Sequence, residues 1–230
     1  MKSLSILASV VILSMAACGD KSGSKPTLKN MDDSFAYAFG GYSGSMLHNF
    51  KIKEVNWEIF KAALEQGLKN GDSSLAMNRE TIGKILNDYT IEAQFGGNKK
   101  LGDDFINKRK SDGYFVSKTG LLFKQIKAGN GVKPNITDTV EVHYTGKFID
   151  GKIFDSNEGK SAFKTALNAG AIKGFLEALS MMEEGSTAEI IIPWQLAYGQ
   201  EGSRNPYTGE MSIEPFTTLC FTLTLDNIKR

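Results

Sequence analysis

The residues best suited to chemistry in this chain lie on a predicted β-hairpin. Val140, Val142 and Tyr144 alternate with polar residues, as in a strand with one buried face, and Asp150-Gly151 is suited to a tight turn. The returning strand places an aromatic ring beside a carboxylate, at Phe154-Asp155. Elsewhere the sequence shows no convincing nucleophile, metal-ligand cluster or phosphate-binding loop. We therefore expect chemistry that depends on the shape of an aromatic surface, with no cofactor and no metal.

Composition narrows the class of protein. The 230 residues suffice for two domains, and the 27 Lys and Arg residues nearly cancel the 26 Asp and Glu residues. This balance argues against a nucleic-acid partner, because such proteins usually carry a basic face. Hydrophobic residues make up 41% of the chain, which is enough for a packed core.

The N-terminus has the pattern of an export signal. Lys2 precedes an apolar run over residues 4–15, which is short for a membrane span, and small residues then lead to Cys18. This junction is similar to the lipobox of bacterial lipoproteins, in which the cysteine is lipidated. We predict a signal peptide over residues 1–18, lipidation of Cys18 that anchors the chain to a membrane, and a flexible tether over residues 19–31. The alternative is an ordinary cleaved signal with an incidental cysteine.

Residues 32–112 have a helical pattern. Asp33 or Ser34 is expected to cap a helix that runs to about Phe50, while Asn56 and Asn78 are expected to cap two further helices. Gly96-Gly97 should break or kink the third helix before a further helical run over residues 99–110.

The apolar stripes of these helices must be covered by something. We predict a homodimer formed through residues 32–112, and the alternative is a compact monomeric helical cap. The proposed contact residues are large and apolar: Phe35, Met46, Trp57, Phe60 and Met77.

Residues 113–230 change to a strand pattern with turn residues between the strands. Five antiparallel strands around one short helix, over residues 171–182, predict an α+β domain. Cys220 is expected to be a buried, inert core thiol, because neither a histidine nor a base adjoins it in sequence. His143 alternates away from Tyr144 and is expected to be structural.

From about Gly120 to Lys229 the chain resembles the FKBP-type peptidyl-prolyl cis-trans isomerases. An ordered series of motifs carries the resemblance: Gly129-Asn130-Gly131, Val142-His143-Tyr144-Thr145-Gly146, Asp150-Gly151, Phe154-Asp155-Ser156, Ala171-Ile172-Lys173-Gly174-Phe175, 182–185, Pro193, Ala197-Tyr198-Gly199 and Thr218-Leu219. The export signal, the helices and residues 102–106 resemble the Mip subgroup of exported bacterial members, which dimerise through an N-terminal helical domain. The resemblance implies a half-open antiparallel sheet wrapped around one short helix, preceded by an all-α dimerisation domain.

The resemblance also implies an apolar pocket between the sheet and the helix. The family's catalytic positions fall on Tyr144, Phe154, Asp155, Ile172 and Tyr198, and its substrate-binding positions on Phe163, Ala171, Phe175, Ile213 and Phe221. In these roles Phe154, Phe175 and Phe221 hold the proline ring, while the Ile172 N–H and Tyr198 hold substrate carbonyl groups. Asp155 orients Tyr144 or faces the twisted amide. Taken singly, the aromatic residues suit an ordinary core equally well.

Three departures from the family pattern concern the pocket. Phe175 stands where the family usually has a tryptophan, the segment 200–211 is longer than expected and is predicted to overhang the pocket, and Glu214 replaces a proline. These departures bear on substrate preference and on macrolide binding.

The implied function is isomerisation of X–Pro bonds in exported proteins, at a membrane-anchored position in the periplasm or at the cell surface. The alternative is a dimeric chaperone or binding module with weak or no isomerase activity. Both readings have proline-containing or unfolded polypeptides as partners.

Overall fold

The computed structural model describes residues 25–71, 75–168 and 170–230. The predictions for the signal peptide, Cys18 and the first part of the tether lie outside these residues. The chain divides into two compact units, one ending at Ser45 and the other covering Met46–Arg230. The predicted domain boundary between residues 112 and 113 stays a prediction.

The first unit contains most of helix α1 (Met31–Asn49). The cap of this helix is Asn30, whose side chain accepts a hydrogen bond from the Asp33 N–H at 2.8 Å. The prediction of Asp33 or Ser34 as the cap is therefore wrong, because the helix begins a few residues earlier. Its apolar side chains remain open to solvent in the single chain, and Phe35 is 69% exposed.

Three further helices open the second unit. Asn56 caps α2 (Trp57–Asn70) and Asn78 caps α3 (Arg79–Phe95), as predicted, through hydrogen bonds from the Ile59 and Thr81 N–H groups. Helix α4 (Gly97–Arg109) follows directly after Gly96, so the predicted break is a short interruption. No residue of α3 is buried, whereas Gly102 and Ile106 of α4 are. No helix in the described part of the chain is long and apolar enough to cross a membrane.

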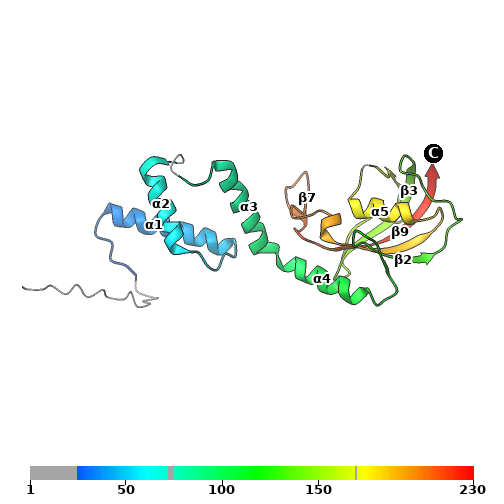
Figure 1. Cartoon of the computed structure of the whole chain (residues 1–230), viewed down its shortest axis with the longest axis horizontal. Helices are drawn as coiled ribbons and strands as arrows, with labels where there is room; N and C mark the ends of the chain where they lie inside the picture. Colours follow the sequence, from blue (N-terminus) through cyan, green and yellow to red (C-terminus); the bar gives the residue numbers. More distant parts are fainter. Residues whose placement is uncertain (1–24, 72–74, 169) are drawn as a thin grey trace, which may run out of the picture. The chain divides into compact units, whose positions relative to one another are not determined.

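The remainder is an antiparallel sheet with one helix against it (Figure 1). The strand order is β1-β2-β6-β9-β3-β4, β5 also pairs with β3, and β7 and β8 form a separate pair. The bounds are β1 (Phe115–Val116), β2 (Leu122–Lys127), β3 (Thr139–Phe148), β4 (Ile153–Ser156), β5 (Phe163–Ala166), α5 (Lys173–Met181), β6 (Thr187–Ile192), β7 (Ser203–Arg204), β8 (Met211–Ile213) and β9 (Leu219–Lys229).

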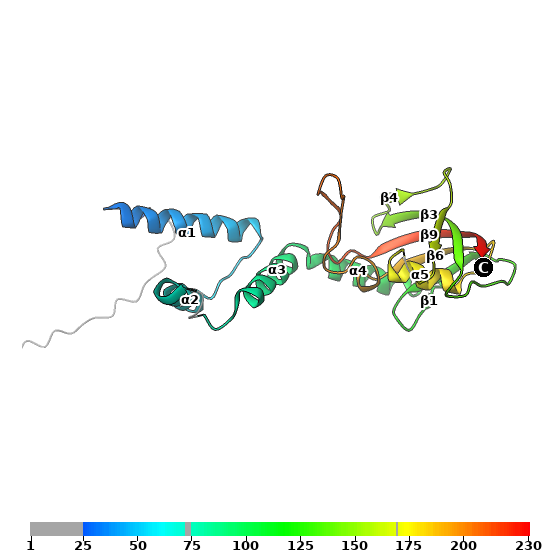
Figure 2. The ribbon, with the colours of Figure 1, turned by 90° about the horizontal axis from the view of Figure 1, so that it is seen from above.

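The predicted α+β class is confirmed, but the expected count of five strands is wrong: the main sheet has seven strands among the described residues. Strand β1 has two residues, which is too short for a periodic signal. The predicted hairpin is present, with Asp155 of β4 opposite Gly146 of β3. Figure 2 shows that β3, β9 and β6 lie side by side in the sheet, with β9 in the middle.

Helix α5 covers the inner face of the sheet. Its buried residues Phe175, Ala178 and Leu179 join the main core, which includes Ile190 and Ile192 of β6. A Cβ atom on Gly174 would lie 2.4 Å from Ile192 Cγ2, so glycine allows the helix to approach the strand closely. We call the face that packs on α5 the inner face.

Helix α4 packs against the other face, which we call the outer face. The Ile191 side chain lies on the face of β6 opposite to Ile190 and Ile192, and it forms a second buried cluster with Ile106 and Leu122. A Cβ atom on Gly102 would lie 2.3 Å from Thr218 Oγ1, which is buried and has no hydrogen-bond partner among the described residues. The close approach of α4 therefore excludes water from this hydroxyl group. Residues 97–109 are fastened to the strands by these contacts.

Candidate functional site

A cavity of about 130 Å³ lies between α5 and the inner face of the sheet, and we call it the inner cavity. Nine of the ten predicted pocket residues line it: Tyr144, Phe154, Asp155, Phe163, Ala171, Ile172, Phe175, Tyr198 and Phe221. Gly170 also lines it, and no signal in the sequence singled that residue out. Ile213 is not among the lining residues; it is 4% exposed and belongs to the main core. The folded chain thus gathers residues that are up to 77 positions apart, from Tyr144 to Phe221.

Aromatic rings meet edge to face around the inner cavity. The ring centroids of Tyr144 and Phe175 are 5.7 Å apart with the planes at 87°, and those of Phe154 and Phe221 are 5.6 Å apart at 90°. Phe175 also meets Phe221 at 5.5 Å. Such contacts fix the rings by their quadrupoles as well as by apolar contact, so the walls are rigid and poor in polar atoms.

Gly146 allows the rings of β4 and β9 to close over β3. A Cβ atom at this position would lie 2.6 Å from Phe154 Cζ and 2.8 Å from Phe221 Cε1. The glycine belongs to the motif around Tyr144, but its role depends on a pairing between strands that the sequence does not state.

The polar groups at the cavity mouth are a tyrosine and a carboxylate. The Tyr144 hydroxyl donates to Asp155 Oδ2 at 2.7 Å. Burial, together with this hydrogen bond and the charge of Asp155, raises the pKa of Tyr144 well above its ordinary 10.0. Burial and the same carboxylate raise the pKa of Tyr198. Both phenols therefore remain protonated at neutral pH and can donate hydrogen bonds.

Two donors at the cavity have no partner among the described residues. Ile172 has extended dihedral angles of −65° and 148° and precedes α5; its carbonyl accepts from Phe175 N–H, while its own N–H makes no hydrogen bond there. The Tyr198 hydroxyl likewise makes none there, and the residue is 38% exposed. Unpaired donors beside apolar walls can bind the carbonyl groups of a peptide.

Asn157 and Ser156 hold the backbone of Tyr144, and neither role was predicted from the sequence. Asn157 Oδ1 accepts from the Tyr144 N–H at 2.7 Å, and its Nδ2 donates to the Val142 carbonyl at 2.9 Å. Ser156 Oγ donates to the Tyr144 carbonyl at 3.1 Å. Asn157 is 9% exposed, and a buried polar side chain needs hydrogen-bond partners. The signal in the sequence was its position, directly after the Phe154-Asp155-Ser156 motif.

The three departures from the family pattern lie in different surroundings. The Phe175 ring is 4% exposed, lines the inner cavity and contacts Tyr144, Phe163 and Phe221, and its role as the floor of a proline site stays a prediction. No residue of the long segment 200–211 lines the inner cavity. This segment instead contains β7 and reaches α3, where Gln200 Nε2 donates to Asp88 at 3.4 Å. Glu214 accepts a hydrogen bond from Asn98 of α4.

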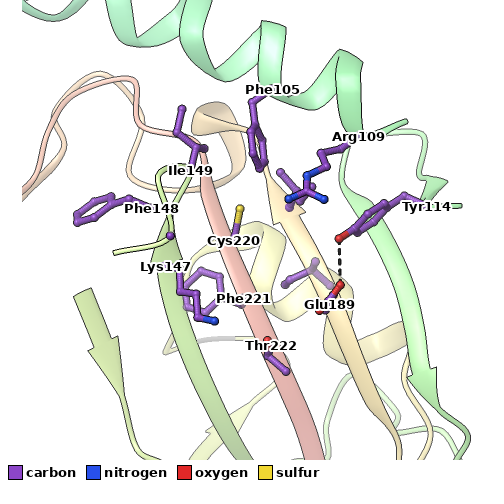
Figure 3. Close-up of a pocket in the computed structure, with 13 residues that line it drawn as sticks. Phe105, Arg109, Tyr114, Lys147, Phe148, Ile149, Glu189, Cys220, Phe221 and Thr222 are labelled. Carbon is purple, nitrogen blue, oxygen red and sulfur yellow. Dashed lines mark hydrogen bonds between the residues drawn. The ribbon is translucent and has the colours of Figure 1, made fainter. Parts of the chain in front are cut away.

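A second cavity, of about 300 Å³, lies between α4 and the outer face (Figure 3). We call it the outer cavity, and its lining includes Phe105, Arg109, Tyr114, Lys147, Phe148, Glu189 and Cys220. Tyr114 donates to Glu189 at 3.2 Å. Cys220 is half-buried, so the prediction of a buried core thiol is wrong: it faces the outer side of β9, and Phe221 faces the core. Burial raises the pKa of the thiol to about 11, which keeps it neutral.

His143 lies on the side of β3 opposite to Tyr144, as predicted. Its Nδ1 is 2.6 Å from Asp226 Oδ2 and its Nε2 is 3.0 Å from the Lys160 carbonyl oxygen. Two acceptors favour the doubly protonated ring, and they raise its pKa above 6.5. No cluster of three metal-ligating side chains occurs within residues 25–71, 75–168 and 170–230.

Comparison with protein families matches residues 130–226 to the FKBP-type peptidyl-prolyl cis-trans isomerases. The chain is 42% identical over 207 residues to the FKBP-type 22 kDa peptidyl-prolyl cis-trans isomerase of Escherichia coli, covering 87% of this chain and 97% of that protein. It is 33% identical over 209 residues to the outer membrane protein MIP of Legionella longbeachae, covering 86% of each. The crystal structure of FkpA from Escherichia coli matches with a TM-score of 0.54 at 27% identity, covering 88% of this chain and 99% of that one.

Proposed function

The chain belongs to the family of FKBP-type peptidyl-prolyl cis-trans isomerases, and we propose that its inner cavity accelerates X–Pro isomerisation in exported polypeptides. The observation that supports this best is the aromatic cavity with two donors that have no partner in the described part of the chain, the Ile172 N–H and the Tyr198 hydroxyl. Such a cavity fits a proline ring, and the donors fit the carbonyl groups that flank it.

The reaction needs no covalent step. Rotation about a peptide bond crosses a barrier of about 18–20 kcal/mol because amide resonance is lost, and uncatalysed X–Pro exchange takes tens to hundreds of seconds. The twisted amide has less charge separation than the planar one. Apolar walls with little water therefore stabilise the twisted form relative to the planar form.

Each lining residue has a role in this proposal. Phe154, Phe175 and Phe221 hold the proline ring, with Phe163 and Ala171 extending the wall. The Ile172 N–H and the Tyr198 hydroxyl donate to substrate carbonyl groups. Asp155 holds the Tyr144 hydroxyl and faces the rotating amide. Ile213 supports this wall from the core.

A protease-coupled assay on a proline tetrapeptide tests the activity. We expect catalysis by the unmutated chain, and a loss of about tenfold or more, or about 1.4 kcal/mol, in both Phe154→Ala and Asp155→Ala. Circular dichroism of each variant checks that the fold is retained. An uncatalysed rate with the unmutated protein would overturn the proposal and leave the binding function described next.

Exposed apolar side chains on α1 and α2, and in the segment between α2 and α3, favour an additional function as a dimeric chaperone. Trp57 is 67% exposed and Met77 49%, while Met46 and Phe60 are also exposed. We propose that residues 32–112 form a homodimer through these side chains and Phe35, because isolated amphipathic helices are stabilised mainly by packing. Sedimentation of the chain lacking residues 1–20 tests this, and a monomer at micromolar concentration contradicts it.

The proposed site of action is a bacterial membrane facing the periplasm or the cell surface. It is supported by the lipobox-like sequence at Cys18 and by the relative named as an outer membrane protein. We expect Cys18→Ala to move the protein from the membrane fraction to the soluble fraction. Retention of that variant in the membrane fraction contradicts the lipid anchor.

A further inference from the structure

The beginning of α4 contacts residues 214–216, a loop that is hydrogen-bonded to the backbone beside Tyr198. Asn98 Nδ2 donates to Glu214 Oε2 at 3.1 Å and to the Pro215 carbonyl oxygen at 3.0 Å. The Lys99 ammonium group lies 4.2 Å from the centroid of the Phe216 ring and 5.7 Å from that of the Trp194 ring. It also pairs with Glu92 of α3. We call Asn98 and Lys99 the α4 clamp.

The rings under Lys99 are connected to both backbone neighbours of Tyr198. Trp194 and Phe216 meet edge to face, with centroids 5.1 Å apart and planes at 82°. The Trp194 carbonyl accepts from the Ala197 and Gly199 N–H groups at 3.1 and 3.0 Å, and the Phe216 N–H donates to the Gly199 carbonyl at 2.9 Å. The backbone on each side of Tyr198 is therefore hydrogen-bonded to the backbone of Trp194 or Phe216, the two residues whose rings lie next to Lys99.

Phe216 has a conformation that requires external support. Its φ angle is +60°, a left-handed value that is unfavourable for a residue with a Cβ atom. The residue is 3% exposed, and its ring contacts both the Trp194 ring and the Lys99 ammonium group. A cation over an aromatic ring is attracted by the ring quadrupole, so Lys99 favours this arrangement.

We propose that Asn98 and Lys99 are positioning residues for the isomerase reaction, which place the Tyr198 hydroxyl by holding residues 214–216. This inference rests on the proposed function of the inner cavity. Glu214, one of the departures from the family pattern, serves here as an acceptor for the clamp. The helix before the sheet thus contributes to the geometry of substrate binding, although neither clamp residue lines the inner cavity.

A matched pair of lysine variants in the full chain tests the clamp. Lys100 neighbours Lys99 on α4, is 80% exposed and pairs with Asp104 on the same helix. We expect Lys99→Met to lower kcat/KM for a proline tetrapeptide about two- to tenfold, mainly by raising KM, which corresponds to one weakened hydrogen bond. Lys100→Met should stay within a factor of about 1.5, because that side chain contributes only an exposed helix pair.

A double-mutant cycle separates positioning of Tyr198 from general stability. If Lys99 acts through the Tyr198 hydroxyl, Lys99→Met should cost little further kcat/KM in a Tyr198→Phe background. Full additivity of the two variants, or equal effects of Lys99→Met and Lys100→Met, overturns the proposal.

Asn98→Ala is the second variant, and Glu214→Gln, which keeps an acceptor oxygen, should retain more activity than Glu214→Ala.

Tryptophan fluorescence tests the clamp even if the protein has no isomerase activity. In a Trp57→Phe background the signal comes from Trp194 alone, since the chain has two tryptophans. Lys99→Met should change its emission and Lys100→Met should not. An inactive unmutated protein contradicts the proposed function. If the protein is active, but Lys99→Met changes neither its Trp194 emission nor its kcat/KM, only the clamp is contradicted.

Discussion

The inner and outer cavities lie on opposite faces of one sheet and differ in the state of their polar groups. The outer cavity is larger, at about 300 Å³ against about 130 Å³. Two of its polar lining residues are hydrogen-bonded to each other, since Tyr114 donates to Glu189, and Arg109 pairs at 3.2 Å with Asp112, which lies outside the lining. The inner cavity is smaller, but among the described residues its donors at Ile172 and Tyr198 have no partner, and they lie beside aromatic walls. This difference, rather than volume, is the reason for placing the proposed substrate site in the inner cavity.

Neighbouring residues of β9 give the largest expected contrast between the two faces. Phe221→Leu shortens the inner wall and should lower kcat/KM about 10- to 100-fold, while costing about 1–2 kcal/mol of stability. Cys220→Ala removes the thiol of the outer face and should change kcat/KM less than about twofold. The assay is the protease-coupled one, with denaturant unfolding for stability. A larger loss in Cys220→Ala than in Phe221→Leu would reverse the assignment of the two faces.

Gly146 gives a test of the close ring packing. Gly146→Ala places a methyl group against the Phe154 and Phe221 rings, so it should cost about 1–3 kcal/mol of unfolding free energy and also lower kcat/KM. Gly83 of α3 is the control, because nothing lies within 4 Å of the Cβ position there. Gly83→Ala should leave the activity unchanged and stabilise the helix by about 1 kcal/mol. Equal thermal stability of the two variants contradicts the tight packing over Gly146.

The two faces should also differ in their response to pH, and this is the smallest expected effect. The Lys160 carbonyl and Asp226 contact the two ring nitrogens of His143 and, with nearby Glu158, raise its pKa above 6.5. Folding therefore favours the protonated ring, and the stabilisation is complete below the unfolded pKa and lost as pH rises through the folded one. The inner phenols have pKa values raised above 10.0, so they stay neutral throughout.

We expect Tm to fall as pH rises above about 6.5 in the unmutated chain, and this fall to be smaller in His143→Gln. Thermal unfolding followed by circular dichroism measures it, and kcat/KM measured over the same range should not follow the titration of His143. Asp226→Asn is the matched control, since it removes the charge and keeps an acceptor. An identical pH dependence of Tm in the unmutated chain and in His143→Gln contradicts the assigned role.

Local patterns in the sequence predicted several elements well. The alternation around Val142 and Tyr144, and the capping residues Asn56 and Asn78, depend on neighbours within a few positions, and the structure has the hairpin and both helix starts. The family resemblance identified nine of the residues around the inner cavity, and seven of them lie in the ordered motifs.

The features that the sequence did not predict depend on contacts across long separations. The register that brings Phe221 opposite Gly146 is a property of the β3–β9 pairing, and no local pattern contains it. Ile213 carries the apolar character of a pocket residue, but β8 directs it into the core. Lys99 and Phe216 are 117 positions apart, so their contact had no signal in either segment.

The buried cluster of Ile106, Leu122 and Ile191 has a consequence for where the chain can be divided. The family match begins at residue 130, but Leu122 is fully buried and Ile191 is 2% exposed, partly because α4 covers them. A fragment beginning after α4 would expose both side chains, each worth about 1.5–3 kcal/mol when buried. An expression fragment for the isomerase portion should therefore begin at or before Gly97. The same requirement applies to recombination of domains: the sheet keeps its buried outer face only if α4 is transferred together with it.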